Sequence, residues 1–153
     1  MAENGIAYTD SLDPTATQLF EDQGYVIVRG LLDYAEDIKP VRDEYAALLE
    51  SLAHRWHRQG KLSSTYDDLP FEQRLAMVAS EGVRYTDYFD IIFTGKEGHM
   101  HRGPAVFNLL RSPRLLDGVE HFIGPEIYSN PIQHIRIKVP ERLVSKENQN
   151  DMN

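Results

Sequence analysis

The sequence predicts an α+β fold in which several helices precede most of the strands. In four segments apolar residues recur at helical spacing, and two other segments have the composition of β-strands. The strand segments are 25–28, a β-branched and aromatic run between two glycines, and 132–139, where apolar and polar residues alternate. With 153 residues, of which 41% are hydrophobic, the chain has the size of one domain or of a large part of one.

The predicted helices are recognised by their boundary residues as well as by their apolar stripes. Asp13 is a good N-cap, Pro14 suits the first helical position and Gly24 provides a C-terminal stop. The longest helix begins at Pro40 and carries Trp56 on its apolar stripe, which assigns this tryptophan to packing. The four helices are expected to cover 14–23, 40–59, 70–81 and 113–123.

Composition excludes several classes of protein. The 24 acidic and 16 basic side chains give a formal charge of -8, and no run of Lys and Arg is interleaved with aromatic residues, so we expect no nucleic-acid partner. Cysteine is absent, which excludes disulfides and thiolate nucleophiles and favours a reducing compartment. No long apolar run occurs, so we expect no membrane span and a cytoplasmic location.

The expected strand 132–139 is the most informative segment for function. Its alternation places Ile135, Ile137 and Val139 on one side, and His134, Arg136 and Lys138 on the other. Arg offers a bidentate fork and Lys a point charge, so the cationic side could bind the carboxylate of a small molecule. The alternative is that this side is simply solvated, as one face of many antiparallel sheets is.

Two histidines suggest a second kind of site. His99 and His101 are two residues apart, so on an extended segment both would point the same way and could share a metal ion. A third ligand would have to come from elsewhere, for instance from Asp87 or Asp90. The alternative, a glycine-flanked surface loop that carries two histidines without a metal, is the favoured interpretation.

Several catalytic motifs are absent. The sequence contains no Gly-x-Ser-x-Gly, no phosphate-binding Gly-Lys-Ser/Thr loop and no Gly-x-Gly-x-x-Gly. None of the six histidines is followed two residues later by Asp or Glu. The pair that begins a two-histidine, one-carboxylate iron site is therefore missing from these residues.

Two segments resemble the phytanoyl-CoA dioxygenase family. Residues 20–32 are similar to the opening helix, glycine turn and first strand of that family, and 121–127 followed by 133–140 is similar to its helix, Gly-Pro turn and first cofactor-facing strand. The resemblance implies a double-stranded β-helix of the jelly-roll or cupin type. It also implies an oxygenase that uses Fe(II) and 2-oxoglutarate to hydroxylate a small organic substrate.

The resemblance gives individual residues a role. By position, His134 corresponds to the strand residue that flanks 2-oxoglutarate, Lys96 to a loop lysine that contacts it, and Arg136 and Lys138 to residues of the same lining face. The iron-binding His-x-Asp of the family lies one connection beyond the strand that ends here at Pro140. No metal ligand is therefore assigned to this chain.

These observations lead to one expectation and two alternatives. We expect 1–153 to be a single partial domain, the N-terminal part of such an oxygenase, with a frayed polar tail over 141–153. Alone it is expected to be inactive and to self-associate through exposed sheet edges. The alternatives are a non-catalytic module that binds an anion through the cationic side of 132–139, and a metalloprotein built on the two histidines.

Overall fold

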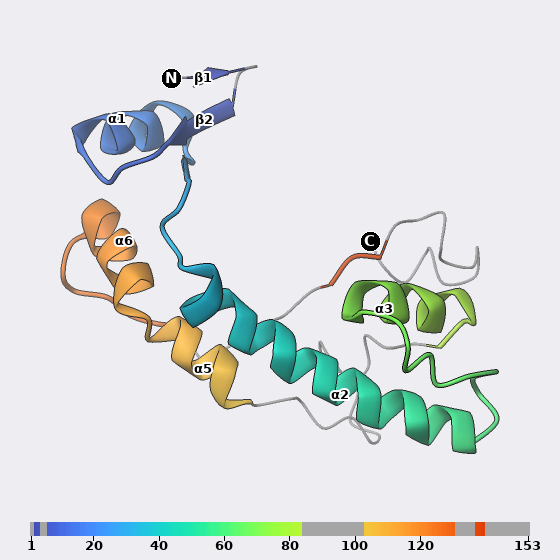
Figure 1. The fold of residues 1–153 in the computed structure, drawn as a ribbon. Helices are drawn as coiled ribbons and strands as arrows, with labels where there is room; N and C mark the ends of the chain where they lie inside the picture. Colours follow the sequence, from blue (N-terminus) through green and yellow to red (C-terminus); the bar gives the residue numbers. More distant parts are fainter. Residues whose placement is uncertain (1, 4–5, 84–102, 131–136, 140–153) are drawn as a thin grey trace. The chain divides into compact units, whose positions relative to one another are not determined.

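The computed structural model describes residues 2–3, 6–83, 103–130 and 137–139 (Figure 1). The chain divides into two compact units, the first made of 1–42 and 103–131 and the second of 43–102 and 132–153. Helices and a small sheet occur together, which confirms the α+β class at this coarse level. The single partial domain over 1–153 stays a prediction.

Helices dominate the described chain and the strands are short. In chain order the elements are β1 (Ala2–Glu3), β2 (Ile6–Thr9), α1 (Pro14–Gln23), β3 (Ile27–Val28), the π-helical turn η1 (Tyr34–Ile38), α2 (Lys39–Arg58), α3 (Phe71–Ser80), α5 (Pro104–Leu110) and α6 (Pro113–Ile123). The four expected helices correspond to α1, α2, α3 and α6 within one or two residues. None of these described helices has both the length and the apolar content that a membrane crossing requires.

The first unit begins with a small sheet whose two parallel strands are joined through α1. β2 pairs with β3 in parallel and with β1 in antiparallel fashion. Asp13 caps α1, because its carboxylate accepts hydrogen bonds from the backbone N–H of Thr15 at 2.8 Å and of Ala16 at 3.3 Å. Gly24 ends α1 with a φ of 75°, a left-handed conformation that glycine adopts without steric cost.

The strand expected at 25–28 is present only as β3 and is not buried. Ile27 is 49% exposed and Tyr25 is 43% exposed. The reason is the position of β3 at the end of the strand order β1-β2-β3, where only β2 pairs with it among the described strands. The apolar run between the two glycines favoured a buried strand over 25–28. This prediction is wrong, because only Ile27–Val28 form a strand and Ile27 is half exposed.

Helix α6 packs against α1 in the first unit. The rings of Phe20 and Phe122 lie 5.1 Å apart between centroids. His121 Nε2 lies 3.2 Å from the carbonyl oxygen of Asp13, and because a carbonyl only accepts, the ring donates this hydrogen bond. Gly118 lies under Leu31, and a Cβ at this glycine would come within 2.9 Å of a Leu31 methyl group. A side chain at position 118 would therefore require the Leu31 side chain to shift.

The core of the second unit lies along one stripe of α2 and one of α3. The buried residues are Tyr45, Leu49, Leu52, Ala53 and Trp56 on α2, and Arg74, Leu75, Val78 and Ala79 on α3. The stripe on α2 follows the predicted helical spacing, and the assignment of Trp56 to packing is confirmed, since this residue is 1% exposed.

The connection between α2 and α3 is held by polar contacts in addition to the burial of Leu62, which is 4% exposed. The Glu81 carboxylate accepts from the backbone N–H of Ser63 at 2.8 Å, from the Ser63 hydroxyl at 3.0 Å and from the Tyr66 hydroxyl. Nearer to α3, Arg74 donates to the carbonyl oxygen of Thr65 at 2.9 Å and to the Asp67 carboxylate. These bonds fix the connection at two points.

Candidate functional site

Of the four predicted cofactor-binding residues, one lies in the described part of the chain. Lys138 is exposed, and the neighbouring Val139 is 6% exposed and belongs to the core. This difference agrees with the expected alternation at these two positions, although residues 137–139 are assigned to no strand. The other three, His134, Arg136 and Lys96, lie outside the described residues, as do His99, His101, Asp87 and Asp90.

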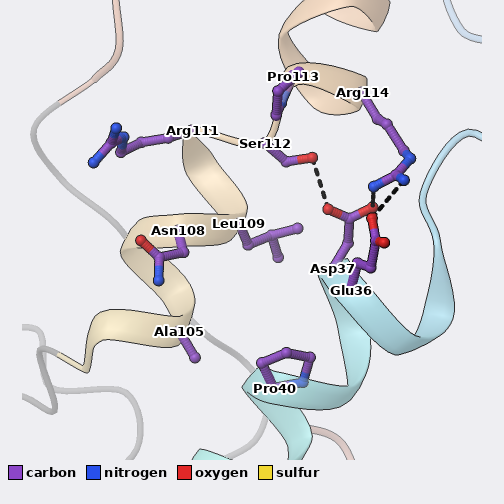
Figure 2. A pocket seen from close by; sticks show the side chains of 10 residues that line it. All are labelled: Glu36, Asp37, Pro40, Ala105, Asn108, Leu109, Arg111, Ser112, Pro113 and Arg114. Carbon is purple, nitrogen blue, oxygen red and sulfur yellow. Dashed lines mark hydrogen bonds and ion pairs between the residues drawn. The ribbon is translucent and has the colours of Figure 1, made fainter.

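A pocket of about 350 Å³ lies in the first unit, between η1, the start of α2, α5 and the start of α6 (Figure 2). The sequence did not predict it. Its lining combines charged, amide and hydroxyl groups with short apolar side chains. The lining residues are Glu36, Asp37, Pro40, Ala105, Asn108, Leu109, Arg111, Ser112, Pro113 and Arg114.

Asp37 is a buried residue of the pocket lining and is 7% exposed. Ser112 donates its hydroxyl to Asp37 Oδ1 at 2.7 Å, and Arg114 donates to Oδ2 at 3.2 Å (Figure 2). The backbone N–H of Asp33 also donates to Oδ2 at 2.8 Å. One side chain thus joins η1 to the junction of α5 and α6, across more than seventy residues of sequence.

The local sequence explains why Asp37 is held in place. Asp33 accepts a hydrogen bond from the backbone N–H of Glu36 at 2.8 Å, while Asp37 accepts one from the N–H of Asp33. This reciprocal arrangement resembles a capping box and fixes the first turn of η1. Ser112 precedes Pro113 at the N-cap of α6, yet its hydroxyl makes no hydrogen bond to its own helix and is free to donate to Asp37.

The electrostatics make Asp37 a permanent anion at neutral pH. The Ser112 hydroxyl, the Asp33 N–H and the charge of Arg114 together lower the pKa of Asp37, and they outweigh desolvation, which acts in the opposite direction. The pKa of Arg114 is raised, chiefly by its hydrogen bond to Glu36 at 2.5 Å. A carboxyl group with a lowered pKa is a poor proton donor near pH 7, so the hydrogen bonds of Asp37 point to a role in ordering the pocket.

The lowered pKa of Asp37 predicts a pH-dependent stability. A carboxylate whose pKa is lower in the folded state stabilises it above the ordinary value of about 3.9 and loses this contribution as the pH falls through the folded-state pKa. We expect Asp37→Asn to lower the melting temperature of the first unit at neutral pH, with a difference from the wild type that shrinks below about pH 4. Circular dichroism melts across this range measure the difference.

Asp68→Asn is the matched control, since Asp68 is exposed and does not line the pocket. Its difference from the wild type should be small at neutral pH. An Asp37→Asn difference that stays constant from neutral pH into acid would show that the Asp37 charge does not stabilise the fold.

The described residues contain no group of three or more His, Asp or Glu side chains that could hold a metal ion. The pocket offers two carboxylates, Glu36 and Asp37, and both are engaged by Arg114. Glu36 and Asp37 therefore do not fit an iron site of the kind that the family resemblance implies.

Comparison with family models, curated proteins and solved structures finds no match for this chain.

Proposed function

We propose that these residues form the helical support and the cofactor-facing part of an Fe(II)/2-oxoglutarate oxygenase similar to the phytanoyl-CoA dioxygenases, acting on a small organic substrate. One observation carries the proposal. The end of α1, the left-handed turn at Gly24 and β3 follow one another within 20–32, the segment that resembles the opening of that family. Helix α6, which ends before Gly124 within the second resembling segment, gives further support.

The proposal includes the finer fold, a double-stranded β-helix to which β1, β2, β3 and the expected strand 132–139 would contribute. It assigns His134, Lys96, Arg136 and Lys138 to 2-oxoglutarate. The exposure of Lys138 beside the buried Val139 supports a cationic side that a ligand can reach. The proposal assigns no iron ligand to these residues, because the His-x-Asp spacing is missing from their sequence and the described part offers no suitable cluster.

Calorimetric titration with 2-oxoglutarate tests the proposed role of the cationic side. We expect binding in the millimolar range, weakened about tenfold by Arg136→Gln and by Lys138→Gln, because each removes a charged donor to a carboxylate. Lys61→Gln is the matched control, since Lys61 is also exposed and its replacement changes the net charge equally. Absence of binding, or equal weakening by the control, would contradict the proposal.

Two further measurements separate the proposal from its alternatives. Mn(II) should not strengthen binding, and Fe(II) should not support conversion of 2-oxoglutarate to succinate by this chain. Stronger binding with Mn(II), or succinate formation with Fe(II), would place iron ligands among these residues. A non-catalytic anion-binding module would use the same exposed Lys138. It would bind succinate and glutarate as well as 2-oxoglutarate, whereas a preference for 2-oxoglutarate favours the oxygenase.

A further inference from the structure

We infer that the pocket beside Asp37 binds a small primary amine in its protonated form, with the ammonium group at Asp37 and Ser112 and the apolar body against α5. This inference does not rest on the proposed function, because none of the four residues assigned to 2-oxoglutarate lines the pocket. It depends on which side chains face the gap of the pocket, on which of their atoms can still accept a hydrogen bond, and on the charge beside them.

Apolar side chains form much of this gap, which lies between α5 and the facing segment of η1 and α2 (Figure 2). Leu109 extends from α5 toward Asp37, and Pro40 lies in the first turn of α2. Ala105 is one helical turn before Leu109, so the two lie on the same face of α5. In a pocket of about 350 Å³, this surface suits an apolar body much smaller than a nucleotide.

The buried polar atoms beside the apolar surface are acceptors. Asp37 is 7% exposed and Ser112 is 5% exposed. An ionised carboxylate can accept about four hydrogen bonds, whereas Asp37 accepts three from the described residues, namely from Ser112, Arg114 and the Asp33 N–H. The Ser112 hydroxyl donates to Asp37 and accepts no hydrogen bond within the described part of the chain. Both side chains therefore retain room for a donor.

The charge beside these acceptors favours a cation. Glu36 and Asp37 carry two negative charges, and Arg114, which donates to both, carries one positive charge. The Arg111 side chain points away from the gap (Figure 2), and its guanidinium lies 5.4 Å from the centroid of the Phe107 ring. The lowered pKa of Asp37 keeps this carboxylate charged at neutral pH, so an ammonium ion is attracted to its open position without displacing Arg114.

The chemistry of the acceptors selects among small ligands. A primary ammonium carries three N–H donors on one nitrogen, so it can donate to Asp37 and Ser112 together. A carboxylate ligand would meet two acceptors and a negative charge instead of donors. A metal ion would require further oxygen or nitrogen ligands, and the described residues hold no group of three that could supply them.

The probe n-butylamine, which is protonated at neutral pH, tests the inference, and n-butanol is its uncharged counterpart. We expect calorimetry or ligand-observed NMR on the full chain to detect n-butylamine binding in the millimolar range or tighter, and n-butanol binding about tenfold weaker. A third probe, n-butyltrimethylammonium, keeps the charge but has no N–H to donate. It should also bind about tenfold more weakly than n-butylamine.

Two variants change the two parts of the pocket separately. Asp37→Asn should weaken n-butylamine binding about tenfold, because the charged acceptor is lost. This titration is made below the melting temperature of the variant, so that the folded protein is measured. Ala105→Leu keeps Asp37 and its hydrogen bonds, and it should weaken binding because the larger side chain fills the apolar part of the gap.

Asp68→Asn is the matched control, since Asp68 is exposed, lies outside the pocket and loses the same charge as Asp37→Asn. It should bind n-butylamine as the wild type does. The inference is overturned if n-butylamine does not bind, if either of the other probes binds equally well, or if Asp37→Asn or Ala105→Leu binds as the wild type does. Equal weakening by Asp68→Asn would also overturn it, because the amine would then be attracted by the overall negative charge of the chain.

Discussion

Replacing Leu49 by alanine is expected to lower the free energy of unfolding of the second unit by about 2–5 kcal/mol. Leu49 lies in the middle of α2 and has no exposed surface. Truncation to alanine removes buried methyl and methylene groups and leaves a cavity that the neighbouring side chains fill only in part. Because whole domains are stable by only about 5–15 kcal/mol, this one change removes a large fraction of the stability.

Trp56 makes the measurement direct. It is the single tryptophan of the chain and is buried on the same stripe of α2 as Leu49, so its fluorescence reports on this unit. Urea titrations followed at Trp56 should show a lower midpoint for Leu49→Ala and an almost unchanged midpoint for Glu50→Ala, in which an exposed neighbour is replaced. Equal midpoints for the two variants would mean that the α2 stripe does not form the core.

The helices could be predicted because their ends are encoded locally. Asp13 and Gly24 lie within a turn of the helix that they limit, and each acts through a few neighbouring backbone groups. The burial of Trp56 could be predicted from the same kind of information. The spacing of apolar residues along a helix is the same whichever element packs against them. Local signals of this sort require no knowledge of distant residues.

The strands and α5 could not be predicted as well, for physical reasons. In β2 the buried residue is Ala7, at 1% exposure, while Ile6 is 46% exposed. A search for alternating apolar residues would place the larger Ile6 side chain in the core, which is the opposite of what the structure has. Helix α5 has only seven residues and no fully buried one, which leaves a weak stripe. The exposure of Ile27 depends on what lies beside β3, and its own sequence does not specify that.

The pocket was missed because its wall is assembled from distant residues. Ser112 directly precedes the predicted helix 113–123 and Asp37 lies in no recognised motif, so neither residue indicated a pocket. Their hydrogen bond joins positions 75 residues apart, and no spacing rule reaches across such a distance. A short-range signal did exist in the two aspartates at 33 and 37, which form hydrogen bonds within one turn. Their spacing indicates an ordered carboxylate, but it does not indicate which distant residue binds that carboxylate.

Replacing Arg74 by methionine is expected to destabilise the second unit by about 2 kcal/mol, through lost hydrogen bonds rather than lost volume. The residue is 7% exposed, and its guanidinium donates at 2.9 Å to the carbonyl oxygen of Thr65 and also to Asp67. Methionine keeps most of the buried stem, so packing changes little. What it removes is a charged donor, and the Thr65 carbonyl then loses that partner in the connection between α2 and α3.

Arg74→Lys separates charge from geometry at this position. Lysine keeps the positive charge beside Asp67 but cannot present the planar fork that reaches the carbonyl and the carboxylate together. The urea midpoint at Trp56 should therefore lie between those of the wild type and Arg74→Met, while Arg58→Met, at an exposed position of α2, should leave it unchanged. If lysine restored the full midpoint, the charge beside Asp67 alone would hold the connection, and the bond to Thr65 would contribute nothing.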